Sequence, residues 1–218
     1  MIKNNRFICL YSGGTDSPVA CYLAIKKGMQ PLVLHFHFMD LYPLTDEKFK
    51  YKALEGVKEL NKFLNNPIKI YLIPHGNSIA EYMKNCSREK LLCVFCRRMM
   101  YRIAEVIAEQ ENTNIIITGE SLGEKASQTP INLRVIESVL KHSTVFRPLI
   151  CFEKLEVEEI AKKIGTYESS IKQKVCCSSV PQYPETKARL HQIEEEESKL
   201  NIEKLIEESI SKAEIFQS

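Results

Sequence analysis

Five short apolar runs, each separated from the next by a segment of helical spacing, constrain the fold of this chain more than any other feature. Such runs, rich in β-branched or aromatic residues and bounded by turn residues, are typical of strands. They are RFICLYS (6–12), LVLHFHF (32–38), IKIYLIP (68–74), NIIITG (114–119) and VFRPLI (145–150). The helical segments between them cover residues 16–28, 46–65, 78–86, 94–111 and 131–140. This alternation predicts a three-layer α/β/α fold with a five-stranded, mainly parallel sheet.

The part of the chain that follows the fifth run has a different character. An amphipathic helix is expected over residues 154–165, with Gly165 ending it, and the polar, proline-containing segment 166–184 is expected to be a loop. Residues 185–214, which include the run Glu194 to Glu197, are expected to form a solvated helix pair packed on the sheet. We therefore expect a main domain over 1–165 and an extension over 166–218.

The stretch SGGTDS, residues 12–17, joins the first predicted strand to the first predicted helix. One interpretation is a tight turn, because glycine tolerates backbone angles that other residues avoid. The other is a phosphate site, because the N–H groups and the positive end of a helix N-terminus attract anions. Asp16 would then hold Mg²⁺ against the phosphates. The spacing fits neither the dinucleotide fingerprint nor the Walker motif, so a different phosphate loop is required.

Composition limits the class of protein without identifying a partner. The formal net charge of +2 does not distinguish a nucleic-acid binder, and the chain shows neither a bilayer-spanning apolar stretch nor a signal sequence. We expect a cytoplasmic protein with no membrane partner. Eight cysteines are many for a reducing compartment, where a disulfide framework is not expected. They point to metal, persulfide or redox chemistry.

The motif SGGTDS resembles the S-G-G-x-D-S signature of the PP-loop ATP pyrophosphatases, which cleave ATP between its α and β phosphates. Further segments resemble the catalytic domain of tRNA 4-thiouridine synthetase, the ThiI family of tRNA sulfurtransferases. These are LYSGGTDSPVACYLAIKKG, LHFHF, CRRMMYRIAE, ITGESLGEKASQTPINLRVIE and RPLICFEKLEVEEIAKKIGTYE. Full-length members carry a ferredoxin-like and THUMP RNA-binding region before this domain, and some carry a rhodanese domain after it. The first predicted strand begins almost at Met1, so the resemblance implies a stand-alone form that lacks both.

The resemblance implies an ATP site. It consists of Leu10, Tyr11, Ser12, Gly13, Gly14, Thr15, Asp16, Ser17, His35, Phe36, Arg97, Gly119 and Gln128. Physical reasoning agrees for several of them, because His35, Phe36 and Gly119 lie at the carboxyl ends of predicted parallel strands, where ligands bind. Arg97 would neutralise phosphate charge. Taken alone, His35 would be interpreted as a histidine near the core, and its position in the resemblance makes the two interpretations equal.

The cysteines divide into two classes. Cys9, Cys21 and Cys151 lie among apolar residues and are expected to be buried and structural. Cys93 and Cys96 form a C-x-x-C at a helix start, where the helix dipole favours thiolate.

The resemblance adds a functional cysteine in the late loop, matched to Cys177, with its neighbour Cys176 as the fallback. Three thiolates would hold a [4Fe–4S] cluster with one open iron, which we prefer because members without the rhodanese domain include cluster-dependent enzymes. The alternatives are zinc, a metal-free site in which Cys177 carries a persulfide, and a purely structural C-x-x-C.

The resemblance implies an ATP-dependent sulfurtransferase that adenylates a uracil carbonyl oxygen, in tRNA, and replaces that oxygen with sulfur to give 4-thiouridine. Asp16, Cys93, Cys96 and Cys177 would be the catalytic residues. Expected partners are tRNA, a sulfur donor protein or free sulfide, and a second copy of the chain. The alternatives are a small-molecule acceptor, an RNA presented by a separate THUMP-type subunit, and a cluster-binding accessory protein. Direct tRNA binding is expected to involve the cations Arg98, Arg102, Lys172 and Lys174.

Overall fold

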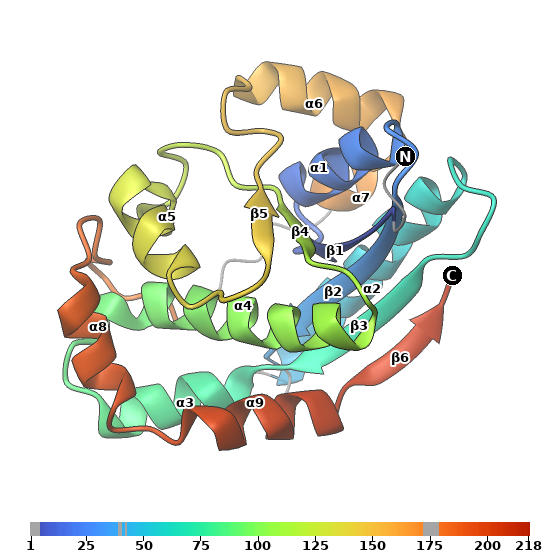
Figure 1. The fold of residues 1–218 in the computed structure, drawn as a ribbon. Coiled ribbons are helices and arrows are strands. Elements are labelled where there is room, and N and C mark those ends of the chain that lie inside the picture. The colour runs from blue at the N-terminus through green and yellow to red at the C-terminus, as the bar shows by residue number, and fades with distance from the viewer. Residues whose placement is uncertain (1–4, 39–40, 42, 172–178) are drawn as a thin grey trace.

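The computed structural model describes residues 5–38, 41, 43–171 and 179–218, with side chains omitted for 43–50. Strands and helices alternate along most of it (Figure 1). The strands are β1 (Arg6–Leu10), β2 (Gln30–His37), β3 (Lys69–Pro74), β4 (Ile115–Thr118), β5 (Thr144–Phe146) and β6 (Glu214–Gln217). The first helices are α1 (Asp16–Ile25), α2 (Pro43–Asn61), α3 (Gly76–Asn85), η1 (Glu89–Leu91) and α4 (Leu92–Gln110). The later ones are η2 (Ala126–Gln128), α5 (Pro130–Glu137), α6 (Lys154–Lys163), α7 (Tyr167–Ile171), α8 (Leu190–Glu197) and α9 (Ile202–Ser211).

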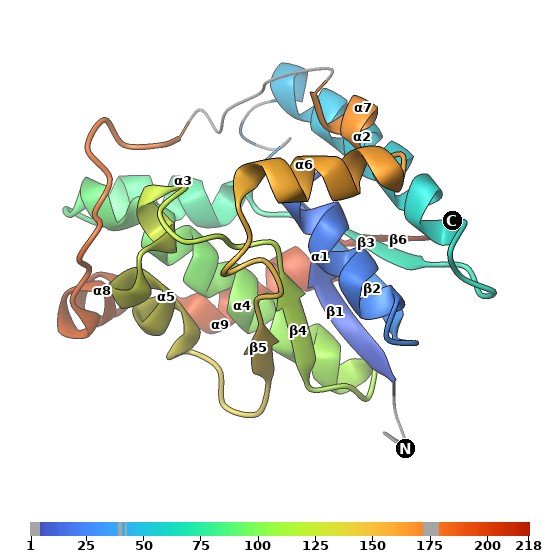
Figure 2. The ribbon, with the colours of Figure 1, turned by 90° about the horizontal axis from the view of Figure 1, so that it is seen from above.

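The sheet has the order β5-β4-β1-β2-β3-β6, and helices cover both of its faces (Figure 2). Strands β1 to β5 pair in parallel, and β6 pairs antiparallel with β3. The three-layer, mainly parallel fold that the sequence predicts is therefore confirmed. The prediction of five strands missed β6, a short edge strand that is exposed along its whole length and carries no strand pattern of its own.

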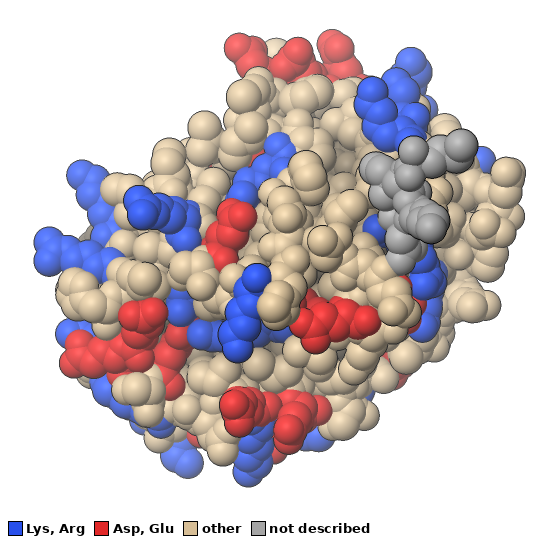
Figure 3. All heavy atoms as spheres, viewed as in Figure 1, with Lys and Arg blue, Asp and Glu red and all other residues tan. Residues whose placement is uncertain are grey.

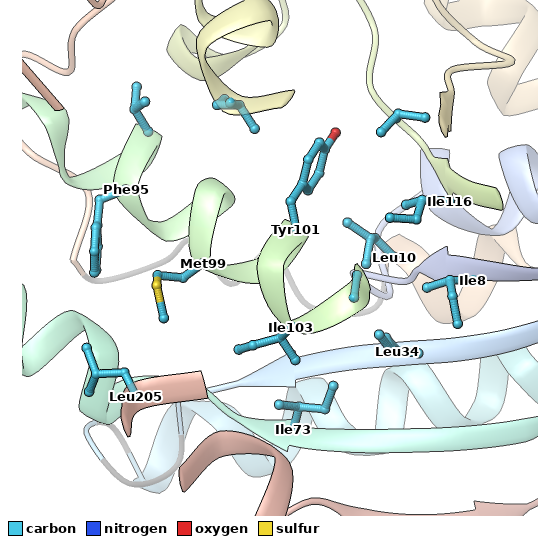
Figure 4. Packing of buried hydrophobic residues seen from close by; sticks show 14 of the residues in the cluster. Ile8, Leu10, Leu34, Ile73, Phe95, Met99, Tyr101, Ile103, Ile116 and Leu205 are labelled. Atoms are coloured by element: carbon cyan, nitrogen blue, oxygen red, sulfur yellow. The ribbon is translucent and has the colours of Figure 1, made fainter. Parts of the chain in front are cut away.

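Alternate residues of the inner strands point into two separate cores. Ile8 and Leu10 of β1 pack with α4 and the C-terminal helices, in the cluster that includes Tyr101 and Leu205 (Figure 4). Phe7 and Cys9 pack on the opposite face against α1, α2 and α6. Cys9 and Cys21 are completely buried, as predicted, whereas Cys151 is exposed, so its predicted burial was wrong.

The charged C-terminal segment contains the expected helix pair, but two of its glutamates are not solvated. Glu196 is completely buried and Glu197 is 6% exposed. The Glu197 carboxylate accepts paired hydrogen bonds from Arg98 at 2.8 Å and from Arg102 at 2.7 Å. The burial of these two glutamates could not be predicted from charge composition, because a run of glutamates does not show which carboxylates are buried. Arg98, 2% exposed, and its neighbour Arg102 therefore hold α8 on α4, which corrects their expected role as RNA contacts.

Glu196 makes the stability of the fold depend on pH in the acid range. Burial alone would raise the pKa of Glu196, but hydrogen bonds from Lys199 and Ser87 outweigh it and lower the pKa to about 2. A carboxyl whose pKa is lower in the folded state stabilises the fold above its unfolded pKa of about 4.3 and loses that contribution as pH falls. We expect the melting temperature to fall between about pH 4.5 and pH 2, with a shallower fall in Glu196→Gln. Exposed Glu195→Gln is the control, and identical profiles for the two variants would contradict the assignment.

Candidate active site at the carboxyl ends of the strands

The loop between β1 and α1 is closed by its own hydroxyl groups. The Ser12 amide donates to Ser17 Oγ at 3.0 Å, the two serine Oγ atoms lie 3.1 Å apart, and the Gly14 amide donates to Ser12 Oγ at 3.3 Å. Gly13 has a φ of +72°, a left-handed conformation that favours glycine. Its Cα faces the backbone of Ala53 on α2, where an added Cβ would lie 3.4 Å from Ala53 Cα. The loop is thus a compact turn held between β1, α1 and α2.

Gly119, the residue after β4, lies against the start of α1. A Cβ on Gly119 would lie 2.6 Å from Ser17 N and 2.7 Å from Ser17 Cα. Real Cβ atoms essentially never come within 3.0 Å of such neighbours, so glycine is required for the loop to lie against the end of β4. The structure therefore brings together the loop residues and Gly119, which the sequence placed in one site.

Gly119→Ala should displace the loop and destabilise the protein. Overpacking against backbone costs roughly 1–3 kcal/mol, which for a chain of this size lowers the melting temperature by about 5 °C. We expect nucleotide affinity to fall at least tenfold, measured by titration with ATP. Gly14→Ala is the matched control, because the nearest neighbour of its Cβ would be Ser12 Oγ at 3.4 Å, an ordinary contact. Equal melting temperatures for the two variants would contradict the packing argument.

Asp16, at the start of α1, forms an ion pair that the sequence did not suggest. Lys154 Nζ, at the start of α6, donates to Asp16 Oδ1 at 2.7 Å and lies 3.3 Å from Glu124 Oε1. Burial alone would lower the pKa of Lys154, but Asp16 and Glu124 together raise it. One signal was available, because a lysine in the first turn of a helix opposes the helix dipole and therefore needs another partner. The pair places a cation and a carboxylate together beside the loop.

The loop also contacts the segment beyond residue 165. Thr15 Oγ1 and Ser170 Oγ on α7 lie 3.1 Å apart, and Ser170 Oγ donates to the Tyr167 carbonyl at 2.7 Å. Thr15 is therefore the donor to Ser170. The prediction of a loop over 166–184 missed α7, which this contact holds against the loop between β1 and α1.

The predicted site residues at the ends of β1 and β2 have largely buried side chains. Leu10 and Tyr11 are 6% and 2% exposed, with side chains in the two cores. His35 is 2% exposed, and its Nδ1 lies 2.9 Å from the Tyr11 carbonyl oxygen. Phe36 meets the ring of His75 edge to face, with centroids 5.5 Å apart. His35 therefore joins the ends of the two strands.

Arg97 belongs to a buried ion-pair network centred on Glu120. The Glu120 carboxylate accepts hydrogen bonds from Arg97, from Arg147 Nε at 2.7 Å and from Tyr101 Oη at 3.0 Å. Burial alone would raise the pKa of Glu120, but the two arginines outweigh it and keep the pKa low. The side chain of Arg97 remains 26% exposed, so it is oriented by Glu120 and still reaches the surface. Glu120 and Arg147 were not predicted from the sequence, although Glu120 lies within the segment ITGESLGEK and Arg147 begins the segment RPLI.

Gln128 lies in η2, shortly after Glu124, the residue that pairs with Lys154. Its Oε1 is buried and has no hydrogen-bond partner among the described residues. A buried amide oxygen without a donor costs about 1–3 kcal/mol, so this atom is suited to a donor from a ligand.

Cys93 and Cys96 lie on the first turns of α4, and both are half-buried. Cys96 Sγ is 3.5 Å from Nε2 of His75, the completely buried residue that follows β3. Cys176 and Cys177 lie outside the described residues, as do Lys172 and Lys174. Within residues 5–38, 41, 43–171 and 179–218, no group of three His, Cys, Asp or Glu side chains is arranged to hold a metal ion.

The fold and the loop define a class of protein. A parallel α/β sheet with a glycine and serine loop at the start of α1 is the architecture of the PP-loop ATP pyrophosphatases. The profile of the family described as thiamine biosynthesis protein (ThiI) matches residues 3–202, so the chain belongs to the ThiI family. In the part of the chain that the structure describes, no helix is long and apolar enough to cross a membrane.

Individual relatives agree with this family. A probable tRNA sulfurtransferase of Acetivibrio thermocellus is 40% identical over 216 residues, 98% of this chain and 54% of the relative. The crystal structure of a 4-thiouridine synthetase in complex with RNA and ATP matches with a TM-score of 0.90 and 34% identity, over 97% of this chain and 55% of that one. The U34-tRNA thiolase NcsA of Methanococcus maripaludis, solved with its [4Fe–4S] cluster, matches with a TM-score of 0.53 and 17% identity, over 98% of this chain and 75% of that one. This last likeness concerns the fold alone. The chain spans about half the length of the curated relatives it matches.

Proposed function

We propose that this chain is the catalytic part of an ATP-dependent tRNA sulfurtransferase that forms 4-thiouridine. The observation that carries the proposal is the self-closed loop Ser12 to Ser17 beside the Asp16 and Lys154 ion pair, in a chain of the ThiI family. The resemblance to a 4-thiouridine synthetase solved with RNA and ATP supports both substrates. The main domain is proposed to span 1–165 with an extension over 166–218, in a cytoplasmic protein.

The proposed reaction has two steps. The uracil O4 attacks the α phosphorus of ATP, so an O–P bond forms and the bond to the β phosphate breaks, releasing pyrophosphate. Sulfide then attacks C4, so a C–S bond forms, its proton is released, and AMP leaves with the former carbonyl oxygen. Adenylation is needed because AMP is a far better leaving group than a carbonyl oxygen.

The residues of the site would act by alignment and charge neutralisation. The loop amides would bind phosphate oxygens, and Lys154 and Arg97 would offset the negative charge that develops on them. Arg97 is suited to this role because Glu120 orients it. Asp16 would position Lys154 or hold Mg²⁺, which favours carboxylate ligands.

The sulfur site is proposed to include Cys93, Cys96 and Cys177, with Cys176 as the fallback. Residues three apart on a helix share a face, so Cys93 and Cys96 are suited to bind one group together. Ser179, two residues after Cys177, lines a cavity with Leu92, which precedes Cys93. We propose that these cysteines hold a [4Fe–4S] cluster, which when bound supplies an iron position for sulfide. Zinc is one alternative. The other is metal-free: a persulfide on Cys177 attacks C4, and the Cys93 or Cys96 thiolate then attacks Cys177 Sγ, which breaks the S–S bond, releases the thiolated uracil and leaves a disulfide.

A turnover assay tests the proposed function. ATP conversion to AMP and pyrophosphate should depend on an added unmodified tRNA and, with sulfide present, should yield 4-thiouridine detected by its near-ultraviolet absorbance. AMP formation with a small acceptor alone would favour the small-molecule alternative. Activity that requires an added THUMP-type subunit would favour RNA delivery by a partner. Absence of AMP formation under all these conditions would contradict the proposal.

Iron content tests the proposed cluster separately from activity. Protein purified without oxygen should be brown and contain about four irons per chain. Cys93→Ala, Cys96→Ala and Cys177→Ala should each lose the iron and keep ATP binding, whereas Cys151→Ala, at an exposed cysteine, should keep both. Colourless protein with one zinc per chain would contradict the iron assignment. Full iron content and activity in Cys176→Ala, in Cys177→Ala and in the double variant would remove the late loop from the chemistry.

A further inference from the structure

Asn132, the third residue of α5, joins two distant segments into one surface. Its side chain is completely buried, and its Nδ2 donates to the carbonyl oxygens of Ala126 and Glu185, each at 2.7 Å. Its Oδ1 accepts from the Ala188 amide at 2.9 Å. Thr129 Oγ1 adds a hydrogen bond to the Thr186 carbonyl at 2.7 Å. The segment from η2 to α5 and the segment before α8 are therefore held together as a single framework.

Four exposed cations lie on this framework. Lys125 precedes Ala126, Arg134 lies two residues after Asn132, and Lys187 and Arg189 flank Ala188. Each cation is therefore at most two residues along the chain from a residue that takes part in the Asn132 hydrogen bonds. Lys and Arg side chains gather over α5 and the segment before α8, on the left of the view in Figure 3.

These cations differ from the arginines of α4. Arg97, Arg98 and Arg102 form ion pairs with buried glutamates. Lys125, Arg134, Lys187 and Arg189 have no ion-pair partner among the described residues. The nearby acids are already engaged, because Glu124 lies beside Lys154 and the Glu185 carboxylate accepts the amides of Thr186 and Lys187. The four charges are therefore available to an external anion.

This cationic surface borders the proposed ATP site. Gln128 lies on η2 within it, and Glu124, adjacent to Lys125, is linked through Lys154 to Asp16. Two exposed apolar side chains, Ile131 and Leu190, are interleaved with the cations. A polyanion bound here would extend to the mouth of the site.

We propose that the cationic surface, formed by Lys125, Arg134, Lys187 and Arg189, binds the phosphodiester backbone of an RNA duplex and so holds the acceptor nucleotide beside the ATP site. A row of unpaired cations on a fixed framework suits repeated backbone phosphates, which gain affinity by releasing counterions. The choice of RNA over another polyanion rests on the proposed function. The position of the surface rests only on the Asn132 framework and the unpaired charges.

The test compares two charge-reversal variants with equal charge change. One carries Lys125→Glu, Arg134→Glu, Lys187→Glu and Arg189→Glu. The control carries Lys26→Glu, Lys27→Glu, Lys162→Glu and Lys163→Glu, four exposed lysines at the far ends of α1 and α6. Binding of a labelled, unmodified tRNA transcript is measured by fluorescence anisotropy across a salt series, and ATP binding is measured in parallel.

We expect the first variant to bind RNA at least tenfold more weakly. The slope of log K against log salt should become shallower by about 3.6, since each of the four phosphate contacts contributes about 0.9. The control should change much less, because screening limits distant charges. Equal weakening in both variants, or no salt-dependent binding by the natural chain, would overturn the inference. The inference would also be overturned if polyglutamate displaced the labelled RNA as effectively as unlabelled RNA does. ATP binding tests the proposed function independently of the RNA surface. If the natural chain did not bind ATP, the proposed function would be contradicted and the RNA surface would not.

Discussion

Asp16→Asn is expected to abolish AMP formation while the protein remains folded. The carboxylate of Asp16 holds Lys154 at 2.7 Å beside the phosphate loop and is the proposed Mg²⁺ ligand. The amide of asparagine is similar in shape but carries no charge, so it neither fixes the ammonium nor binds a hard cation well. Loss of one preorganised electrostatic contact typically costs a factor of about 10²–10³ in rate. We expect a decrease of at least that size in tRNA-dependent AMP formation.

Companion variants separate the two roles of Asp16. If Asp16 acts by positioning Lys154, Lys154→Met should show a loss of similar size, and raising the Mg²⁺ concentration should rescue neither variant. If Asp16 holds the metal, excess Mg²⁺ should partly restore Asp16→Asn and leave Lys154→Met unchanged. Glu159→Gln, at an exposed glutamate of α6, controls for charge, and its activity should match the natural chain. Normal AMP formation by folded Asp16→Asn would refute the phosphate-loop interpretation.

Glu197→Gln is expected to be the most destabilising single substitution considered. Glu197 holds Arg98 and Arg102 in paired hydrogen bonds, and Arg98 is 2% exposed. Removing one partner of a buried ion pair leaves an uncompensated charge and costs about 3–5 kcal/mol. For a chain of this length that corresponds to a decrease in melting temperature of about 10 °C. Thermal unfolding followed by circular dichroism gives the measurement.

The matched control is Glu194→Gln, an exposed glutamate on the same helix, which should change the melting temperature by less than about 2 °C. Replacing both arginines and Glu197 together by methionine should recover much of the lost stability, because the unpaired charge is then absent. Comparable melting temperatures for Glu194→Gln and Glu197→Gln would show that α8 is held on α4 by its apolar contacts instead.

The parts of the fold that could be predicted from sequence are those encoded locally. Strands β1 to β4 are buried and read as short apolar runs, and the α-helices between them carry apolar faces with the expected spacing. β6 could not be found in this way, because its strand character comes from pairing with β3 and not from its four exposed residues. Likewise, the burial of Glu196 and Glu197 is set by partners on α4 and in the segment between α3 and η1.

The candidate site shows the same division. The loop from Ser12 to Ser17 is contiguous, so its motif was legible, and Gly119 followed from its place after a strand. Lys154 reaches Asp16 from 138 residues away, a contact that no local pattern encodes. His75 contacts Cys96 and Glu120 orients Arg97 only because the fold brings their elements together. Sequence therefore indicated proposed ligand-binding residues that belong to contiguous motifs or strand ends, and missed the residues that hold them in place.

The two neighbouring arginines of α4 fix the rotation of that helix about its own axis. Successive helical residues point about 100° apart, so Arg97 and Arg98 anchor α4 in two directions, to Glu120 beside β4 and to Glu197 on α8. Rotation of α4 about its axis in either direction would separate a buried ion pair. Cys93 and Cys96 lie one to five residues before these arginines on the same helix, so their orientation relative to the sheet is also fixed. If these two thiols take part in the proposed sulfur transfer, any rearrangement must come from the groups that approach them.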